Sequence, residues 1–235
     1  TSRRQRQMCI RDRQKGVLIV TSAGNQQSDL QHPGVDTISP DWPPNSAETR
    51  DIKNNCRVAP AELAGALTVS STGPVGVPGY DLWIADYSTV GMSRVDVTAP
   101  GGDYFQGTGL VQDAILAAWS STDQSGQWEL FSNLAAGPFP GLTVEDGGGR
   151  YIYLNGTSMS SPQAAGVAAL VKQIHPGWSP GAVKAAVQRS AQQLSCPPDW
   201  EPLNAVDERE RCYGDDGRSS FFGHGMVDAE AAAGQ

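Results

Sequence analysis

The sequence lacks the features that would assign it to several large classes of protein. No run of apolar residues is long enough to cross a bilayer, so no membrane-spanning segment is predicted. No Cys-x-x-Cys pair or His/Cys spacing indicates a metal site, and no cofactor-binding motif is identifiable. No internal repeat divides the chain. Short apolar runs separated by long polar stretches instead favour a single α/β domain.

Basic residues are scarce outside the start of the chain. Residues 1–14 hold five of the 17 basic residues, one of the 25 acidic ones, and no apolar stretch of the kind a secretion signal needs. We expect this segment to be non-native or disordered, the alternative being a genuine basic surface segment, and we place the domain at 15–235. Subtracting the segment leaves 12 basic and 24 acidic residues, a net charge of −12. Such a surface disfavours nucleic acid and anionic membranes as partners.

Cysteine is rare, and its number is odd once Cys9 of the first segment is set aside. Cys196 and Cys212 bracket a polar loop, and a disulfide between them would stabilise the fold by about 3 kcal/mol in the chain-entropy model. Cys56 is left without an evident partner. We favour an oxidising, extracellular setting over an intracellular chain with three reduced thiols, because small secreted hydrolases use such bridges.

One string of small residues indicates a serine nucleophile. The string NGTSMSSP, residues 155–162, runs directly into an apolar segment at 164–171. Its glycine permits a tight turn, and its proline is tolerated in a first helical turn. The segment 164–171 is apolar on every side, which predicts a core helix whose N-terminal N–H groups face any anion formed beside Ser158. The alternative is an ordinary Ser/Thr cap on a buried helix.

A second segment provides the partner of Ser158. The run GVLIV at 16–20 predicts a strand buried on both faces, and SAGN at 22–25 follows it directly. Open α/β sheets place ligand-binding groups at the carboxyl ends of their strands. The Asn25 amide can donate a hydrogen bond to a developing oxyanion, beside the backbone N–H of Ser158. Alone, Gly-Asn after a strand indicates a turn; with the serine string it predicts a site.

In their order along the chain, these segments resemble the subtilisin-like serine peptidases. The resemblance implies the carboxyl-terminal part of an α/β fold, with a mostly parallel sheet, helices on both faces and long loop inserts. It also implies peptide-bond hydrolysis of a polypeptide substrate, with Ser158 as the nucleophile and Asn25 as the oxyanion donor. Besides the serine string, the matching pieces are TSAGN (21–25), ALTVS (66–70), ADYSTVG (85–91), VDVTAPG (95–101) and GHGMVDA (223–229).

The same resemblance assigns roles to residues beside these two. Ser22, Ala23 and Gly24 would form one wall of the primary specificity pocket. From their positions in the serine string, apart from the resemblance, we expect Thr157 to support the nucleophile turn and Met159, if exposed, to oxidise readily and block the site. Calcium is common in the family, but its ligands cannot be carried over onto matched positions here.

The sequence departs from the family in its first half. Subtilisin-like enzymes run Asp, then His, then Ser along the chain. No Asp-[Ser/Thr]-Gly and no His-Gly-Thr-His precede Asn25 here. We therefore expect a fragment that lacks the amino-terminal half of its own domain and is inactive alone.

None of the three histidines is expected to replace the missing base. His175 follows Ser158 by 17 residues, which places it ~25 Å away along one helix, as a C-terminal cap before a proline. His224 lies between two glycines and is expected to be structural. His32 falls in an insert rich in Pro, Asp and Asn and is expected to be solvated.

Two other classes of function remain open. One is a non-catalytic descendant that binds peptides without cutting them. The other is an esterase of the α/β-hydrolase type, but its Gly-x-Ser-x-Gly elbow needs glycine where this chain has Ser160. Sedolisin-type peptidases also share Gly-Thr-Ser, but they use Asp as the oxyanion partner, so Asn25 favours the assignment to the subtilisin-like peptidases.

The remaining patterns predict the other elements. Apolar runs predict strands at 17–20, 67–69 and 95–97. An Asp-Gly turn between 142–147 and 151–154 predicts a β-hairpin that leads into the nucleophile turn.

Two further stretches have recognisable composition. Residues 28–55 are dense in Pro, Asp and Asn and predict a surface loop. Ser179 and Pro180 predict the N-cap and first turn of a second helix. The apolar stripe of that helix consists of Val183, Ala186 and Val187.

Overall fold

The computed structural model describes residues 14–36, 44–46, 48–52, 57–75, 81–122, 125–196, 212–215 and 217–234. The expectations for residues 1–13 and for Cys56 lie outside these ranges. Its strands are β1 (Val20–Ser22), β2 (Val35–Asp36), β3 (Arg50–Asp51), β4 (Leu67–Val75), β5 (Asp81–Ile84), β6 (Val97–Pro100), β7 (Ile115–Trp119), β8 (Thr143–Asp146), β9 (Gly149–Leu154), β10 (Gly214–Asp215) and β11 (Arg218–Ser219). The longer helices are α2 (Gln127–Ala135), α3 (Thr157–Ile174), α4 (Pro180–Ser190) and α5 (Ala229–Ala233), with 3₁₀ turns η1 (Pro44–Ser46) and η2 (Val111–Asp113).

Strand β4 is the centre of the main sheet. It pairs in parallel with β1 and β6 and antiparallel with β5. Its side chains alternate: Leu67 and Val69 enter a hydrophobic cluster, whereas the hydroxyls of Thr68 and Ser70 donate to backbone carbonyls on the other face. The strand is therefore buried on both faces, with an apolar face toward the helices and a hydrogen-bonded face toward loops.

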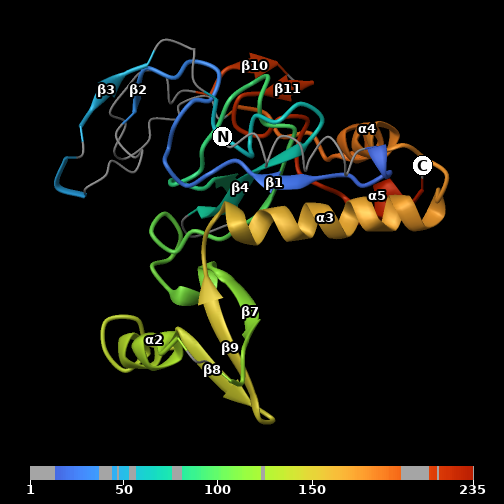
Figure 1. Ribbon diagram of the computed structural model, residues 1–235. Coiled ribbons are helices and arrows are strands. Elements are labelled where there is room, and N and C mark those ends of the chain that lie inside the picture. The colour runs from blue at the N-terminus through green and yellow to red at the C-terminus, as the bar shows by residue number, and fades with distance from the viewer. Residues whose placement is uncertain are drawn as a thin grey trace.

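Helices α3, α4 and α5 share that hydrophobic cluster with β4 and β6. Figure 1 shows α3 lying along the sheet, with α4 and α5 at its carboxyl-terminal end. The predicted start of α4 is confirmed, because the Ser179 hydroxyl accepts from the Ala182 N–H at 3.3 Å and Pro180 opens the first turn. Its predicted stripe is buried as well.

Two strands begin later than the apolar runs predicted. The first runs over Val20–Ser22 rather than 17–20, and Val17 is 50% exposed rather than buried. The third covers Val97–Pro100 rather than 95–97. The register of β4 explains both shifts, because its first residue Leu67 faces Val20, and Val69 faces both Ser22 and Val97.

The expectation that residues 164–171 are buried on all sides was wrong. Helix α3 buries Ala164, Val167, Ala168 and Val171, but Leu170 is 40% exposed. The cause is geometric, since only the face toward the sheet and α4 is covered. Its small apolar residues allow close packing on one side and leave a short apolar stripe in solvent on the other.

The residues between β6 and α3 in the sequence form a separate lobe, which contains η2, β7, α2, β8 and β9. The predicted hairpin of β8 and β9 is confirmed, and β7 adds a third strand in the order β7-β9-β8. The lobe has its own cluster around Val111, Leu142 and Ile152, against which part of α2 packs. Figure 1 shows this lobe projecting from the main sheet, with β9 running back to the start of α3. Neither β7 nor α2 was predicted.

The described parts of the stretch 28–55 contain regular structure that the predicted surface loop did not include. Strands β2 and β3 pair antiparallel within it, and Asp29 and Leu30 are buried. The predicted disulfide between Cys196 and Cys212 is present, with 5.5 Å between the Cα atoms. Within the described ranges, no helix has the length and apolar character to cross a bilayer.

Candidate active site

The chain leaves the sheet at β1 and turns sharply toward Asn25. The N–H of Ala23 donates to the carbonyl of Val69 at 2.9 Å and so continues the ladder for one residue. Gly24 then adopts a φ of 118°, a conformation that favours glycine. Asn25 consequently lies exposed beyond the carboxyl edge of the sheet.

The nucleophile turn is tied to the end of β6. The N–H of Gly156 donates to the carbonyl of Gly101 at 3.0 Å. The Gln163 side chain donates to the carbonyls of Pro100 at 2.6 Å and Met159 at 3.0 Å, which fastens the first turn of α3 to the same strand end. On this support Ser158 is exposed and Met159 is partly exposed.

The structure brings Asn25 and the turn around Ser158 into direct contact. The Oδ1 atom of Asn25 accepts the N–H of Thr157 at 3.0 Å and its hydroxyl at 2.7 Å. Because a backbone N–H can only donate, the carboxamide oxygen must face Thr157, and Nδ2 must face away from it. The Thr157 hydroxyl in turn accepts the N–H of Gly24 at 3.3 Å.

Two hydrogen-bond donors converge beside Gly156. The Nδ2 of Asn25 and the backbone N of Ser158 lie 3.3 and 3.8 Å from the position that a Cβ of residue 156 would occupy. Neither donor has an acceptor among the described residues. With a φ of 151°, Gly156 keeps this space open. The arrangement can hold an oxygen that carries negative charge close to the Ser158 hydroxyl.

The other residues predicted for the site occupy defined positions. Ser22 ends β1, Ala23 is 1% exposed, and Gly24 contacts Thr157, so the three form one stretch leading to Asn25. Thr157 is 1% exposed and bonds both Gly24 and Asn25. The assignment of Ser22, Ala23 and Gly24 to a specificity pocket stays a prediction.

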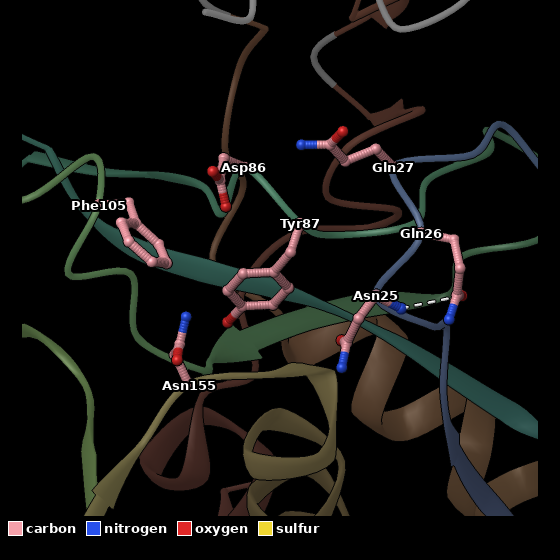
Figure 2. Close-up of a pocket in the computed structure, with 7 residues that line it drawn as sticks. All are labelled: Asn25, Gln26, Gln27, Asp86, Tyr87, Phe105 and Asn155. Atoms are coloured by element: carbon pink, nitrogen blue, oxygen red, sulfur yellow. Dashed lines mark hydrogen bonds between the residues drawn. The ribbon is translucent and has the colours of Figure 1, made fainter. Parts of the chain in front are cut away.

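The structure adds a pocket that sequence reasoning missed. Its volume is about 420 Å³, and Figure 2 shows Asp86, Phe105 and Asn155 directed into a common space beside Tyr87. Asn25 and Asn155 belong both to this pocket and to the segments that carry the candidate site. The full lining is Asn25, Gln26, Gln27, Asp86, Tyr87, Phe105 and Asn155.

Two of the lining residues have perturbed acidity. The Tyr87 hydroxyl donates to the carbonyl of Gly102 at 2.6 Å and lies 2.7 Å from Ser71 Oγ, and burial raises its pKa. Burial, and then the neighbouring carboxyl of Asp103, raise the pKa of Asp86 to about 6. The string ADYSTVG contains Asp86 and Tyr87, but nothing local in it indicates a pocket.

The histidines are held at other places. His175 caps the carboxyl end of α3 as predicted, and its ring stacks on Trp178 at 3.7 Å. The N–H of His224 donates to the carbonyl of Asp96, and burial lowers the pKa of its imidazole. His32 is exposed as expected, with 49% of its side chain accessible, and its Nδ1 also lies 2.9 Å from an oxygen of buried Asp29.

Within the part of the chain that the structure describes, neither these histidines nor any other acid or base is hydrogen-bonded to Ser158. Over the same residues, no group of three or more His, Cys, Asp or Glu side chains is placed to hold a metal ion.

Comparison with known proteins identifies the family. The sequence profile of the subtilase family (Peptidase_S8) matches residues 2–225, and the chain therefore belongs to the subtilases. It is 34% identical over 152 residues to the subtilisin-like protease SBT1.9 of Arabidopsis thaliana, covering 62% of this chain and 16% of that protein. It is 35% identical over 120 residues to M-protease of Shouchella clausii, covering 49% of this chain and 26% of that protein.

The solved structures agree on the fold. Fervidolysin from Fervidobacterium pennivorans, a keratinolytic enzyme related to subtilisin, superposes with a TM-score of 0.58 at 20% identity. The superposition covers 100% of this chain and 25% of fervidolysin. The predicted subtilisin-like α/β class is thus confirmed, and the chain spans a minor part of the length of these relatives.

Proposed function

We propose that this chain carries the nucleophile and the oxyanion site of a serine endopeptidase. The Ser158 hydroxyl attacks the carbonyl carbon of a peptide bond, and the oxygen becomes an oxyanion held by Asn25 Nδ2 and the Ser158 N–H. A base takes the Ser158 proton and passes it to the nitrogen, so collapse of the tetrahedral species expels the amine and leaves an acyl-enzyme, which water hydrolyses. The observation that carries the proposal is the double hydrogen bond from Thr157 to Asn25, which turns the amide nitrogen toward the Ser158 side.

The proposed chemistry needs a base, and we assign it to a part of the protein outside this chain. All three histidines in the sequence have other positions: one at the far end of α3, one beside Asp96 and one beside Asp29. We propose that an aspartate and a histidine from a preceding segment complete the site. Alone, this chain would keep only the weak residual activity of an oxyanion site without a base.

The setting proposed for the enzyme is extracellular, and its substrate is a polypeptide. The disulfide between Cys196 and Cys212 supports an oxidising compartment. Ser22, Ala23 and Gly24 are proposed as one wall of the pocket for the residue that donates the attacked carbonyl. Their support is their position from the last residue of β1 to the residue before Asn25, next to the turn that carries Ser158.

The first test of the peptidase assignment is the nucleotide sequence upstream of this chain. We expect the reading frame ahead of this chain to encode an Asp and a His motif, and the protein that includes them to hydrolyse fluorogenic peptides. A fluorophosphonate probe should label Ser158 in that protein, and Ser158→Ala should abolish both labelling and hydrolysis. Rapid labelling of this chain alone would contradict the assigned base. A complete protein that binds peptides without cutting them would instead support a non-catalytic descendant.

A further inference from the structure

We propose that the pocket lined by Asp86, Phe105 and Asn155 binds the cationic side chain of a lysine or arginine in the polypeptide substrate. The inference rests on the proposed function and deepens it, because it names a substrate class. The pocket opens between Asn25, which follows β1, and Asn155, which directly precedes the nucleophile turn. A side chain within it would therefore belong to a residue close to the attacked bond.

Charge is the first argument for a cationic occupant. Asp86 is the only ionisable carboxyl in the lining, and none of the seven described lining residues is a lysine, arginine or histidine. The neighbouring Asp103 is 1% exposed and directed at backbone donors: its Oδ2 accepts from Asp86 at 2.7 Å, and its Oδ1 accepts from Phe105 and Gln106, both at 3.1 Å. The Asp86 carboxyl also shares a side-chain hydrogen bond with that of Asp103, and of the two carboxyls it is the one that lines the pocket and can face a ligand.

The shape and the remaining polar groups also fit a long cationic side chain. Phe105 is 66% exposed and its ring lies 4.2 Å from that of Tyr104, so it offers an aromatic face to an alkyl stem or to the cation itself. Gln27 and Asn155 place carboxamides at the rim (Figure 2), and their oxygens can accept from an ammonium or guanidinium group. The volume of about 420 Å³ holds such a side chain with some water.

The preference for a cation depends on the ionisation of Asp86. The titratable groups that face it are Asp103, Tyr87 and Tyr104. With a pKa of about 6, Asp86 is charged in neutral and alkaline solution and neutral in acid. Basic side chains are therefore selected above this pH, and the selection disappears below it.

The test uses this chain as it is, with two ligands that differ only in the ammonium group. N-acetyl-lysine methylamide and N-acetyl-norleucine methylamide are titrated while the side-chain amide signals of Asn25, Gln27 and Asn155 are followed by NMR. At about pH 8 we expect the lysine ligand to shift these signals with about tenfold higher affinity than the norleucine ligand. At about pH 5 the ratio should fall to about two or less.

Variants separate the pocket from the rest of the site. Asp86→Asn should remove the lysine preference and leave the norleucine affinity unchanged. The matched control is Asp146→Asn, at the exposed last residue of β8, which should keep the full preference. Equal affinities for the two ligands, or a preference that survives in Asp86→Asn, would overturn the proposal.

The same titration separates this proposal from the peptidase assignment. Pocket binding does not need the nucleophile, so Ser158→Ala should bind the lysine ligand as the parent chain does. Suppose that the lysine ligand binds, but the complete protein neither reacts with the fluorophosphonate probe at Ser158 nor cleaves peptides. The peptidase assignment is then wrong, and the assignment of the pocket is unaffected. If the complete protein cleaves peptides without any preference for a basic side chain, the pocket assignment is wrong and the peptidase assignment is unaffected.

Discussion

The side-chain oxygen of Asn25 accepts two hydrogen bonds from Thr157, from its N–H at 3.0 Å and from its hydroxyl at 2.7 Å. These residues are separated by 132 positions in the sequence. The contact fixes which end of the carboxamide faces the helix, because both Thr157 groups donate to it. It also joins the end of β1 to the start of α3 at the residue before Ser158.

The Thr157 hydroxyl should therefore orient Asn25 as well as stabilise the fold. We expect Thr157→Val to lower the free energy of unfolding of this chain by about 1 kcal/mol, measured by urea denaturation. In the complete protein, kcat should fall between about 10- and 100-fold with KM nearly unchanged, because the donor to the oxyanion is less well fixed.

Serine provides the matched control for this change. Thr157→Ser keeps the hydroxyl and should restore most of kcat, although it loses the buried methyl group. If the valine variant were as active as the parent protein, the hydroxyl would have no positioning role. If the serine variant were as slow as the valine variant, packing of the methyl group would be the cause.

A second prediction concerns Asp96, which joins the sheet to α4. Its carboxylate accepts from the Thr68 N–H at 2.8 Å, from Lys184 Nζ at 2.6 Å and from Gln188 Nε2 at 2.9 Å. The Asp96 and Lys184 side chains are 9% and 21% exposed. We expect Asp96→Asn to lower the free energy of unfolding by about 2–4 kcal/mol, because a largely buried cation then lacks its counter-charge.

An exposed ion pair offers the comparison. Glu145 lies 3.3 Å from Arg150, with side chains 64% and 32% exposed, so Glu145→Gln should change the same free energy by no more than about 0.5 kcal/mol. Equal effects of the two substitutions in urea denaturation would show that burial does not distinguish these pairs.

Features governed by local rules could be predicted from the sequence. The turn at Gly156, the cap at Ser179 and the hairpin of β8 and β9 depend on residues within a few positions of one another. The pairing of Asn25 with Ser158 was inferred from the position of Asn25 after a predicted strand and then supported by a family resemblance, since no local pattern relates two such distant segments. Strand ends were less predictable, because the register of β4 decides where β1 and β6 begin.

The pocket could not be predicted because it depends on tertiary contacts. Asp86 and Asp103 lie 17 positions apart and meet where the turns after β5 and β6 come together. Phe105 follows Asp103 within the loop that leads to the lobe, a segment without a periodic apolar pattern. The contacts of His32 could not be predicted either, because the polar sequence around it indicated only a solvated loop. Its Nδ1 contacts Asp29 and lies 3.2 Å from the Tyr213 hydroxyl.

A third prediction follows from the partial exposure of Met159 beside the nucleophile. Its Sδ lies 3.7 Å from the position that a Cβ of Gly156 would occupy, close to the two donors proposed for the oxyanion. Oxidation adds a polar oxygen to this sulfur. Peroxide should therefore inactivate the complete protein in step with sulfoxide formation at Met159, measured by mass spectrometry. Met159→Leu should keep its activity under the same treatment, and full peroxide resistance of the parent protein would contradict the prediction.

The raised pKa of Asp86 gives a stability that depends on pH. Its pKa moves from 3.8 to about 6 on folding, so between these values the folded chain binds more protons than the unfolded one. The contribution of Asp86 to the free energy of unfolding therefore falls as the pH rises from about 4 to about 6, by about 1 kcal/mol after allowance for solvent screening at this half-buried position. Asparagine resembles the protonated form, so Asp86→Asn should be more stable than the parent chain at about pH 7.5 and equal to it at about pH 4. Urea denaturation at both pH values measures the difference, and Asp146→Asn should show none. A difference that grows toward acid pH would mean that the Asp86 carboxylate is stabilised in the folded chain.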